Sequence, residues 1–309
     1  MEDRAILRER AQNIWGSFAR KFEPIAQAAR LEAMPSQELS RIGGLADAKV
    51  EIQTYASAAT DPDVYARWGT HPPSGVLLFG QRGVGKELLA RSLATLTETS
   101  FLSLAIPKLV LEVIHRSGKV AELVAGWSTA LAEMPPLTVL FNELEFLQAE
   151  EIGTRRLDLP VGPVMDFLLD LVDRAIAVDQ VLVVGSTSHP DTLRRAFTQP
   201  GRLERVVEVS PTYPGDIIEA LRIHASDAEK LAGRALFQQV DWEQVVASVA
   251  IRPMPGDWVH ILHSVLRRKA RCEAAGDPVT PVTNEDFRAE VERFQKANSR
   301  LATPTGTYV

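Results

Sequence analysis

Apolar residues recur in the first 39 residues with the spacing of a helix that buries one face. The stripe consists of Leu7, Ala11, Ile14, Phe18, Phe22 and Ile25. Steps of three and four residues place these side chains on one helical face. Pro24 predicts a kink and Pro35 the end of the segment. The stripe either packs on the chain's own core or contacts a partner or a second copy, and we favour the first interpretation.

Between residues 40 and 211, short apolar runs alternate with helical patterns. The runs predict buried strands at Val76–Phe79, Thr138–Phe141 and Val181–Val184. The helical patterns cover Lys86–Leu96, Val120–Ala132 and Gly162–Ala177. Alternation of this kind predicts the α/β class, with a parallel sheet covered by helices on both faces.

After residue 211 the strand signal fades and only helical patterns remain. They cover Asp216–Ser226, Asp241–Ala250, Gly256–Ala274 and Asn284–Ala297. The predicted organisation is therefore a helical segment at 1–39, an α/β subdomain at 40–211, a small helical subdomain at 212–298 and a flexible tail at 299–309.

Composition narrows the class of protein without defining its chemistry. The chain has 309 residues, of which 45% are hydrophobic and 24% charged, and a net charge of -6. This net negative charge argues against a nucleic-acid partner. Cys272 is the single cysteine, so no internal disulfide forms. The apolar runs are far below the ~18 residues of a membrane span, and we expect a cytoplasmic protein with no membrane partner.

The segment from Gly80 to Glu87 matches the phosphate-binding pattern G-x-x-x-x-G-K, and it departs from the extended pattern at the next residue. It follows a predicted strand and opens a predicted helix, whose N-terminus favours anions. Lys86 is predicted to contact the β- and γ-phosphates of ATP or ADP. The residues predicted to bind the nucleotide here are Gln81, Arg82, Gly83, Val84, Gly85, Lys86, Glu87 and Leu88.

Two positions near the expected phosphates hold unusual residues. Glu87 stands where a Ser or Thr hydroxyl normally binds Mg²⁺, and Asn142 stands where an Asp normally orients the ion. Glu143, next to Asn142, is predicted to polarise the attacking water. Glu87 adds a carboxylate and Asn142 removes one. Either these two residues form a rearranged Mg²⁺ site, or the demand for catalysis has been lost, and we favour the loss.

Four further segments carry motifs that occur together in one family. They are Ser40–Lys49, Pro73–Gly80, Gly185–Leu193 and Gln199–Arg205. With the phosphate-binding loop, they resemble the ordered motifs of AAA ATPase modules over residues 40–297. The resemblance implies a P-loop subdomain, a helical lid and ring-shaped oligomers, expected to be hexameric. Partners would then be copies of this chain or related AAA subunits, together with a protein client.

The resemblance also assigns roles to individual positions. By position, the residues flanking adenine would be Ile42, Gly43, His224 and Gly256. Ser188 replaces the Asn that senses the γ-phosphate, and Gln199 replaces the arginine finger, whose companion Arg202 is kept. Arg116 stands where the central-pore loop usually has an aromatic residue, so threading of a polypeptide by this subunit alone is not expected.

Lys86, Glu143 and Arg202 thus match the family, whereas four positions around the γ-phosphate do not. We interpret the chain as an AAA nucleotide-binding protein with weak or no ATPase activity that serves as a structural or regulatory ring subunit. One alternative is an active ATPase that remodels a protein partner through an unusual Mg²⁺ site. Another is a non-catalytic adaptor that recruits partners through its ends, where Tyr308 and Val309 resemble proteasome-docking tails.

Overall fold

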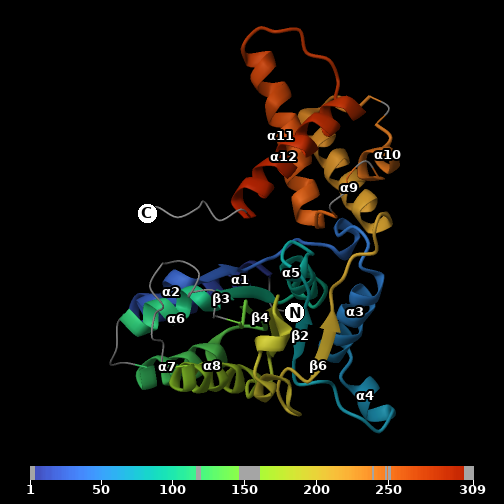
Figure 1. The fold of residues 1–309 in the computed structure, drawn as a ribbon. Coiled ribbons are helices and arrows are strands. Elements are labelled where there is room, and N and C mark those ends of the chain that lie inside the picture. Colours follow the sequence, from blue (N-terminus) through green and yellow to red (C-terminus); the bar gives the residue numbers. More distant parts are fainter. Residues whose placement is uncertain are drawn as a thin grey trace. The chain divides into compact units, whose positions relative to one another are not determined.

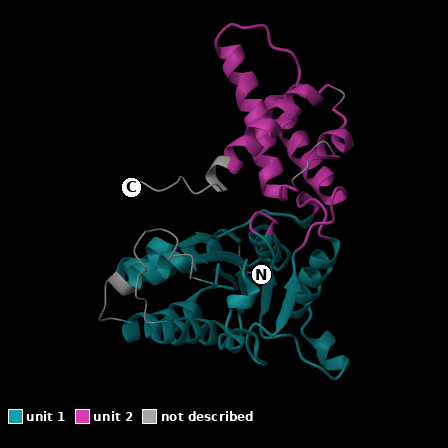
Figure 2. Ribbon diagram, in the orientation of Figure 1, with its two compact units in different colours: residues 1–39, 46–81, 86–209 teal, residues 40–45, 82–85, 210–309 magenta. Residues whose placement is uncertain are grey.

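The computed structural model describes residues 4–115, 120–145, 161–238, 240–247, 249 and 252–302. The chain divides into two compact units (Figure 2). Unit 1 comprises residues 1–39, 46–81 and 86–209, and unit 2 comprises residues 40–45, 82–85 and 210–309. The N-terminal segment therefore groups with the α/β unit, and two short stretches of the α/β sequence group with the C-terminal helices.

Unit 1 is built on a six-stranded sheet in the order β1-β3-β4-β5-β2-β6 (Figure 1). The strands are β1 Ala29–Glu32, β2 Val76–Phe79, β3 Ser100–Ala105, β4 Leu137–Asn142, β5 Val181–Thr187 and β6 Arg205–Glu208. Strands β2 to β6 pair in parallel, and β1 pairs antiparallel to β3 at one edge. The predicted α/β class is confirmed. The apolar runs of β2, β4 and β5 reflect strands covered on both faces.

Eight helices of the described residues belong to unit 1. They are α1 Arg4–Lys21, α2 Glu23–Ala28, α3 Ala46–Thr60, α4 Asp63–Arg67, α5 Lys86–Leu96, α6 Ile106–His115, α7 Val120–Glu133 and α8 Val161–Ile176. Helices α3 and α5 pack against each other, as do α7 and α8. The sheet lies between these two pairs (Figure 1). This layering places the end of β2 and the start of α5 at the carboxyl edge of the sheet, where α/β proteins bind ligands.

The apolar stripe of the N-terminal segment lies in the core of unit 1. Ala11, Phe18, Phe22 and Ile25 are buried, and the ring centroids of Phe18 and Trp127 on α7 are 6.2 Å apart. The helix breaks at Phe22, two residues before Pro24, as the proline predicts. These contacts confirm that the stripe packs on the chain's own core.

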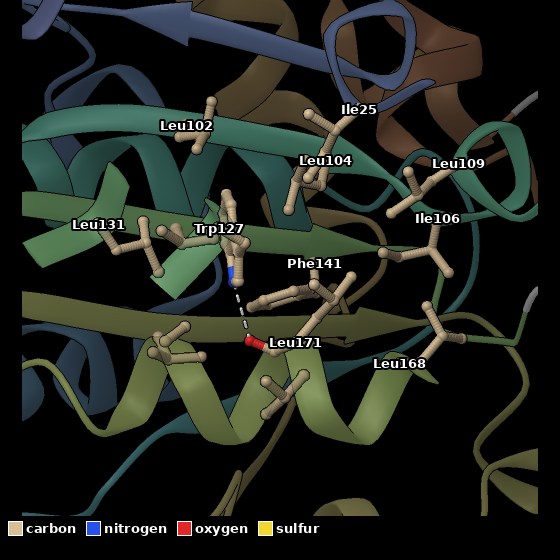
Figure 3. Packing of buried hydrophobic residues seen from close by; sticks show 14 of the residues in the cluster. Ile25, Leu102, Leu104, Ile106, Leu109, Trp127, Leu131, Phe141, Leu168 and Leu171 are labelled. Atoms are coloured by element: carbon tan, nitrogen blue, oxygen red, sulfur yellow. Dashed lines mark hydrogen bonds between the residues drawn. The ribbon is translucent and has the colours of Figure 1, made fainter. Parts of the chain in front are cut away.

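Trp127 shows how α7 and α8 are joined beneath the sheet. Its side chain is fully buried, and its Nε1–H donates a hydrogen bond of 3.1 Å to the Leu171 carbonyl oxygen (Figure 3). Its ring meets that of Phe141 on β4 edge to face, with centroids 6.4 Å apart. Burying such a ring contributes roughly 1.5–3 kcal/mol, and the hydrogen bond removes the cost of a buried donor. The packing holds β4 in place against the helical layer.

Unit 2 contains the four helices that the sequence predicts after residue 211. They are α9 Gly215–Ala232, α10 Trp242–Ala247, α11 Pro255–Ala274 and α12 Asn284–Ala302. Their core is centred on the fully buried Trp258 and Phe287.

Some expectations concern residues that the structure does not describe. Arg116, assigned to the pore-loop position, lies outside the described residues, and so do Tyr308 and Val309. Within the described part of the chain, no helix combines the length and the apolar character needed to cross a membrane.

Candidate nucleotide-binding site

The loop between β2 and α5 has the backbone conformation of a phosphate cradle. Gly83 has φ of 78° and Gly85 has φ of 105°. L-residues with a side chain rarely adopt these values, so glycine is needed at both positions. Such turns direct successive N–H groups toward one point, and the N-terminus of α5 adds its positive end.

Lys86, the first residue of α5, lies folded against the loop that precedes it. Its side chain is buried, and Nζ donates to the Gly80 carbonyl at 2.5 Å and the Gln81 carbonyl at 2.9 Å. It also donates to the Ser188 hydroxyl at 3.1 Å, at the end of β5. These three acceptors are neutral. A phosphate oxygen would form a stronger, charge-assisted bond with the same ammonium group.

Glu87 is engaged by an arginine one turn further along α5. Its Oε1 accepts a hydrogen bond from Arg91 Nη2 at 2.8 Å. Arg91 Nε also lies 3.2 Å from Glu32 Oε2 on β1, and its guanidinium lies 5.5 Å from the ring centroid of Phe101. The Glu87 carboxylate is therefore engaged within α5 by this arginine.

Asn142 ends β4 and is hydrogen-bonded to the neighbouring strand. Its Oδ1 accepts the hydroxyl hydrogen of Ser186 at 2.6 Å, and the same hydroxyl oxygen accepts the Glu143 N–H at 3.2 Å. Glu143 has φ of 60°, in the left-handed region. This conformation costs a non-glycine residue about 1–2 kcal/mol, and strain of this kind is found at functional positions.

Glu145 is a site residue that sequence reasoning missed. It is buried, with its side chain 2% exposed, and its Oε1 accepts the Ser188 N–H at 2.7 Å. His189 Nδ1 lies 3.5 Å from the same oxygen. Glu145 thus positions the turn that presents Ser188 to Lys86. The available signal was the alternation of Asn142, Glu143, Leu144 and Glu145, which places two acidic residues on one side of an extended segment.

Arg202, the retained companion of the arginine finger, is bound within its own unit. Its Nε and Nη2 contact the two carboxylate oxygens of Asp173 on α8 at 2.6 and 2.8 Å, and Nη1 donates to the Ala196 carbonyl at 2.8 Å. The hydrogen bonds with Asp173 raise the pKa of Arg202. Gln199 is exposed on the same loop, and its carbonyl accepts the Arg202 N–H at 3.0 Å.

In unit 2, the predicted adenine-flanking residues Ile42 and Gly43 lie against α9. Ile42 is buried, and a Cβ atom on Gly43 would lie 2.2 Å from the Ala220 nitrogen. Only glycine permits this approach. Ala220 lies one helical turn before His224, so the fold brings the two predicted segments onto one stretch of α9.

The other two predicted adenine-flanking residues also belong to unit 2. Gly256, at the start of α11, donates its N–H to the Gly83 carbonyl at 2.9 Å, which ties the phosphate loop to this helix. His224 lies near His263, with ring centroids 6.2 Å apart, and both line a cavity of about 740 Å³. Burial lowers the pKa of His224, and His263 and Arg41 lower it further. His224 is therefore neutral at physiological pH.

The residues of unit 1 fit a phosphate chain better than they fit Mg²⁺. Lys86, the first residue of α5, supplies a cation. Among the described residues, no cluster of three or more His, Cys, Asp or Glu side chains could hold a metal ion. Glu87 is paired with Arg91, and Asn142 offers a neutral amide whose oxygen is already hydrogen-bonded. Of the two, only Glu87 carries the anionic oxygens that Mg²⁺ prefers, and its carboxylate is engaged by Arg91.

Comparison with known families defines the class of this site. Residues 76–211 match the family model described as "ATPase family associated with various cellular activities (AAA)". Residues 76–211 are thus similar to AAA ATPase domains, and the matched residues include the loop, Glu143 and Arg202. Domains of this family bind nucleotide, typically together with Mg²⁺.

The chain is homologous to proteasome-activating nucleotidases and to 26S proteasome regulatory subunits. It is 29% identical over 94% of its length to a proteasome-activating nucleotidase of Methanothermobacter thermautotrophicus. It is 30% identical over 90% of its length to proteasome-activating nucleotidase 1 of Halobacterium salinarum. Its identity to 26S proteasome regulatory subunit S10B homolog B of Arabidopsis thaliana is 28% over 79% of its length. The chain spans 68%, 65% and 59% of these relatives, respectively.

Proposed function

We propose that this chain is a ring-forming AAA subunit that binds adenine nucleotide, turns ATP over slowly or not at all, and regulates a proteasome-type protease. One observation carries the proposal. Lys86 stands at the lysine position of the phosphate-binding pattern, whereas Glu87 and Asn142, at the two positions expected to bind the metal ion, are hydrogen-bonded to Arg91 and Ser186.

The loop after β5 supports slow turnover. Ser188 is shorter than the Asn expected at the γ-phosphate, and its hydroxyl already accepts a hydrogen bond from Lys86. Gln199 cannot act as an arginine finger, and Arg202 is held by Asp173. Loss of such a finger lowers the rate by about 10³–10⁵-fold in related P-loop enzymes. A related subunit that supplies the finger would be needed for faster turnover.

The direct test is phosphate release by the purified chain with ATP and Mg²⁺, with Glu143→Gln as the matched control. We expect the wild type not to exceed this control, while calorimetry detects nucleotide binding in both proteins. Turnover that is abolished by Glu143→Gln would contradict slow turnover. It would support the alternative function, an active ATPase that remodels a protein partner.

The regulatory role is proposed from the names of the homologues, which are proteasome-activating nucleotidases and proteasome regulatory subunits. It predicts that the chain assembles into rings and increases peptide hydrolysis by a proteasome core particle. Light scattering measures the assembly, and a fluorogenic peptide measures the activation. Deletion of Tyr308 and Val309 tests their predicted docking role. Rings that bind the core particle without these two residues would show that docking uses another surface.

A further inference from the structure

Arg91 on α5 lies between two carboxylates of unit 1, those of Glu87 and Glu32. We propose that Arg91 is a positioning residue for nucleotide binding, because it holds Glu87 and balances a charge that would repel the phosphates. Strand β1 contributes to this function through Glu32, which holds Arg91 in turn. The inference rests on the proposed nucleotide binding, and all three residues belong to unit 1.

The first step concerns the place of Glu87. This residue follows Lys86 directly and lies in the first turn of α5. In the phosphate-binding pattern, the side chain at this position is a Ser or Thr whose hydroxyl binds Mg²⁺ beside the phosphates. A carboxylate there would repel the phosphate oxygens, because like charges at short range disfavour each other. A cation that balances the charge of Glu87 therefore favours nucleotide binding.

The second step concerns the contact between Arg91 and Glu87. Arg91 Nη2 donates to Glu87 Oε1 at 2.8 Å, from a position four residues later in the same helix. Residues at this spacing are neighbours on the helix surface. The Glu87 side chain is 42% exposed, and exposed ion pairs contribute little because holding two long side chains costs entropy. The pair therefore needs further contacts to stay in one arrangement.

The third step concerns those further contacts, which the edge of the sheet provides. Arg91 is only 20% exposed, and its Nε lies 3.2 Å from Glu32 Oε2 on β1. Its guanidinium carbon lies 5.5 Å from the ring centroid of Phe101 on β3. Glu32 and Phe101 are paired with each other in the antiparallel ladder between the two strands. The two strands thus present an anion and an aromatic face side by side, and both attract a guanidinium group.

These contacts give the N-terminal segment a role beyond packing in the core. An arginine that Glu32 and Phe101 already hold loses less side-chain entropy when it also pairs with Glu87. Strand β1 thereby strengthens a contact at the start of α5, although it lies at the edge of the sheet.

The test is a double-mutant cycle of Arg91→Met and Glu87→Thr. Calorimetric titration of the full chain with the non-hydrolysable β,γ-imido analogue of ATP, in buffer with Mg²⁺, measures the affinity. Methionine keeps an apolar contact with Phe101 and removes the charge. Arg91→Met alone should bind at least about tenfold more weakly than the wild type. In the Glu87→Thr background, the same substitution should change the affinity by less than about threefold, because the carboxylate that Arg91 balances is gone.

Two milder variants sharpen the cycle. Arg91→Lys keeps a cation and should bind within about threefold of the wild type. Glu32→Gln leaves the other two side chains in place, and it should weaken binding by about threefold only when Glu87 is present. If Arg91→Met does not fold, Glu32→Gln takes its place in the cycle.

The matched control is Arg174→Met on α8. It removes the cation of another pair at the same helical spacing, formed with Asp170, and should leave the affinity unchanged. Urea unfolding of every variant separates a change in folding free energy from a change in binding.

The outcomes separate this inference from the proposed function. An equal loss of affinity in both backgrounds would overturn the inference, because Arg91 would then act independently of Glu87. Binding by Arg91→Met that equals or exceeds wild-type binding would also overturn it, because a released Glu87 would then not repel the phosphates. Both results leave nucleotide binding intact. An absence of binding by the wild type and by Glu87→Thr would overturn the proposed nucleotide binding and the inference with it.

Discussion

Unit 1 and unit 2 constrain their predicted nucleotide-binding residues by different means. In unit 2, the constraint is close backbone packing. Gly43 lies against Ala220, so a larger residue there would displace a backbone segment, and a Cβ atom on Gly256 would lie 3.1 Å from the Gly83 carbonyl oxygen, a tight contact. In unit 1, the corresponding positions act through side chains, as Glu87 does with Arg91. A side chain can find a new partner without disturbing the sheet beneath it.

This difference explains why the residues that depart from the family pattern all lie in unit 1. They are Glu87, Asn142, Ser188 and Gln199. Substitutions at the end of β4 and the start of α5 change the chemistry of the site and leave its framework intact. Substitutions at the glycines of unit 2 would alter the framework. A chain that no longer needs rapid hydrolysis, but still needs to bind nucleotide, should show this distribution. Four variants, ordered by expected effect, test the comparison.

The largest effect is expected for Lys86→Ala, which removes the only side-chain cation assigned to the phosphates in unit 1. Nucleotide affinity should fall by at least about 100-fold, or about 2.7 kcal/mol, because a charge-assisted contact is lost. Calorimetric titration measures this loss. Lys108→Ala, which replaces an exposed lysine on α6, is the control and should bind as the wild type does. Equal affinities of the two variants would show that the phosphates bind elsewhere.

The next largest effect is expected for Gly43→Ala in unit 2. The added methyl group would lie 2.2 Å from the Ala220 nitrogen, and relieving this overlap should cost about 1–3 kcal/mol of folding free energy. Gly162→Ala is the matched control. No atom lies within 4 Å of its added methyl group, and alanine favours the helix. Urea unfolding compares the two, and a destabilised Gly162 variant with an unaffected Gly43 variant would contradict the packing argument.

A smaller effect is expected for Arg202→Ala, which removes the paired contacts with Asp173. The pair is partly exposed, so the loss should be only about 1 kcal/mol after solvent screening. Arg174→Ala breaks the more exposed single contact with Asp170 and should cost about 0.3–0.5 kcal/mol. Unfolding midpoints rank the two variants. If Arg202→Ala proves no more destabilising than Arg174→Ala, Arg202 is not a structural residue and is available to a neighbouring subunit.

The smallest effect concerns pH and the lowered pKa of His224. Below its ordinary value of 6.5, the unfolded chain takes up a proton that buried His224 resists, so the folded state loses stability as the pH falls. The dependence should be weaker in His224→Gln. His263, whose pKa is also lowered by burial, adds a contribution of the same sign. Unfolding measured on both sides of pH 6.5 gives the slopes, and identical slopes would exclude His224 as the cause.

Sequence patterns predicted those elements whose buried residues form a clear apolar pattern along the chain. The predicted strand Val76–Phe79 and the predicted helix Lys86–Leu96 match β2 and α5 at both ends. In these two elements the residues that the fold buries are the same apolar residues that form the pattern in the sequence. Strands β1, β3 and β6 were missed, and β3 is an interior strand. Strands β1 and β6 lie at sheet edges and have only one buried position or none, so their sequences show no apolar run. Their pairing partners, β3 and β2, determine that they are strands.

The sequence by itself determined the α/β class, the phosphate loop and the identities of the unusual residues, because spacing and glycine conformation are local properties. It could not determine what Arg91, Asn142 and Arg202 contact, since their partners Glu32 on β1, Ser186 on β5 and Asp173 on α8 are distant in the sequence. Glu145 and the two backbone stretches that pack in unit 2 were likewise recognisable only in three dimensions. The reason is physical: hydrogen bonds across strands and close backbone contacts depend on which segments meet, and tertiary packing decides this.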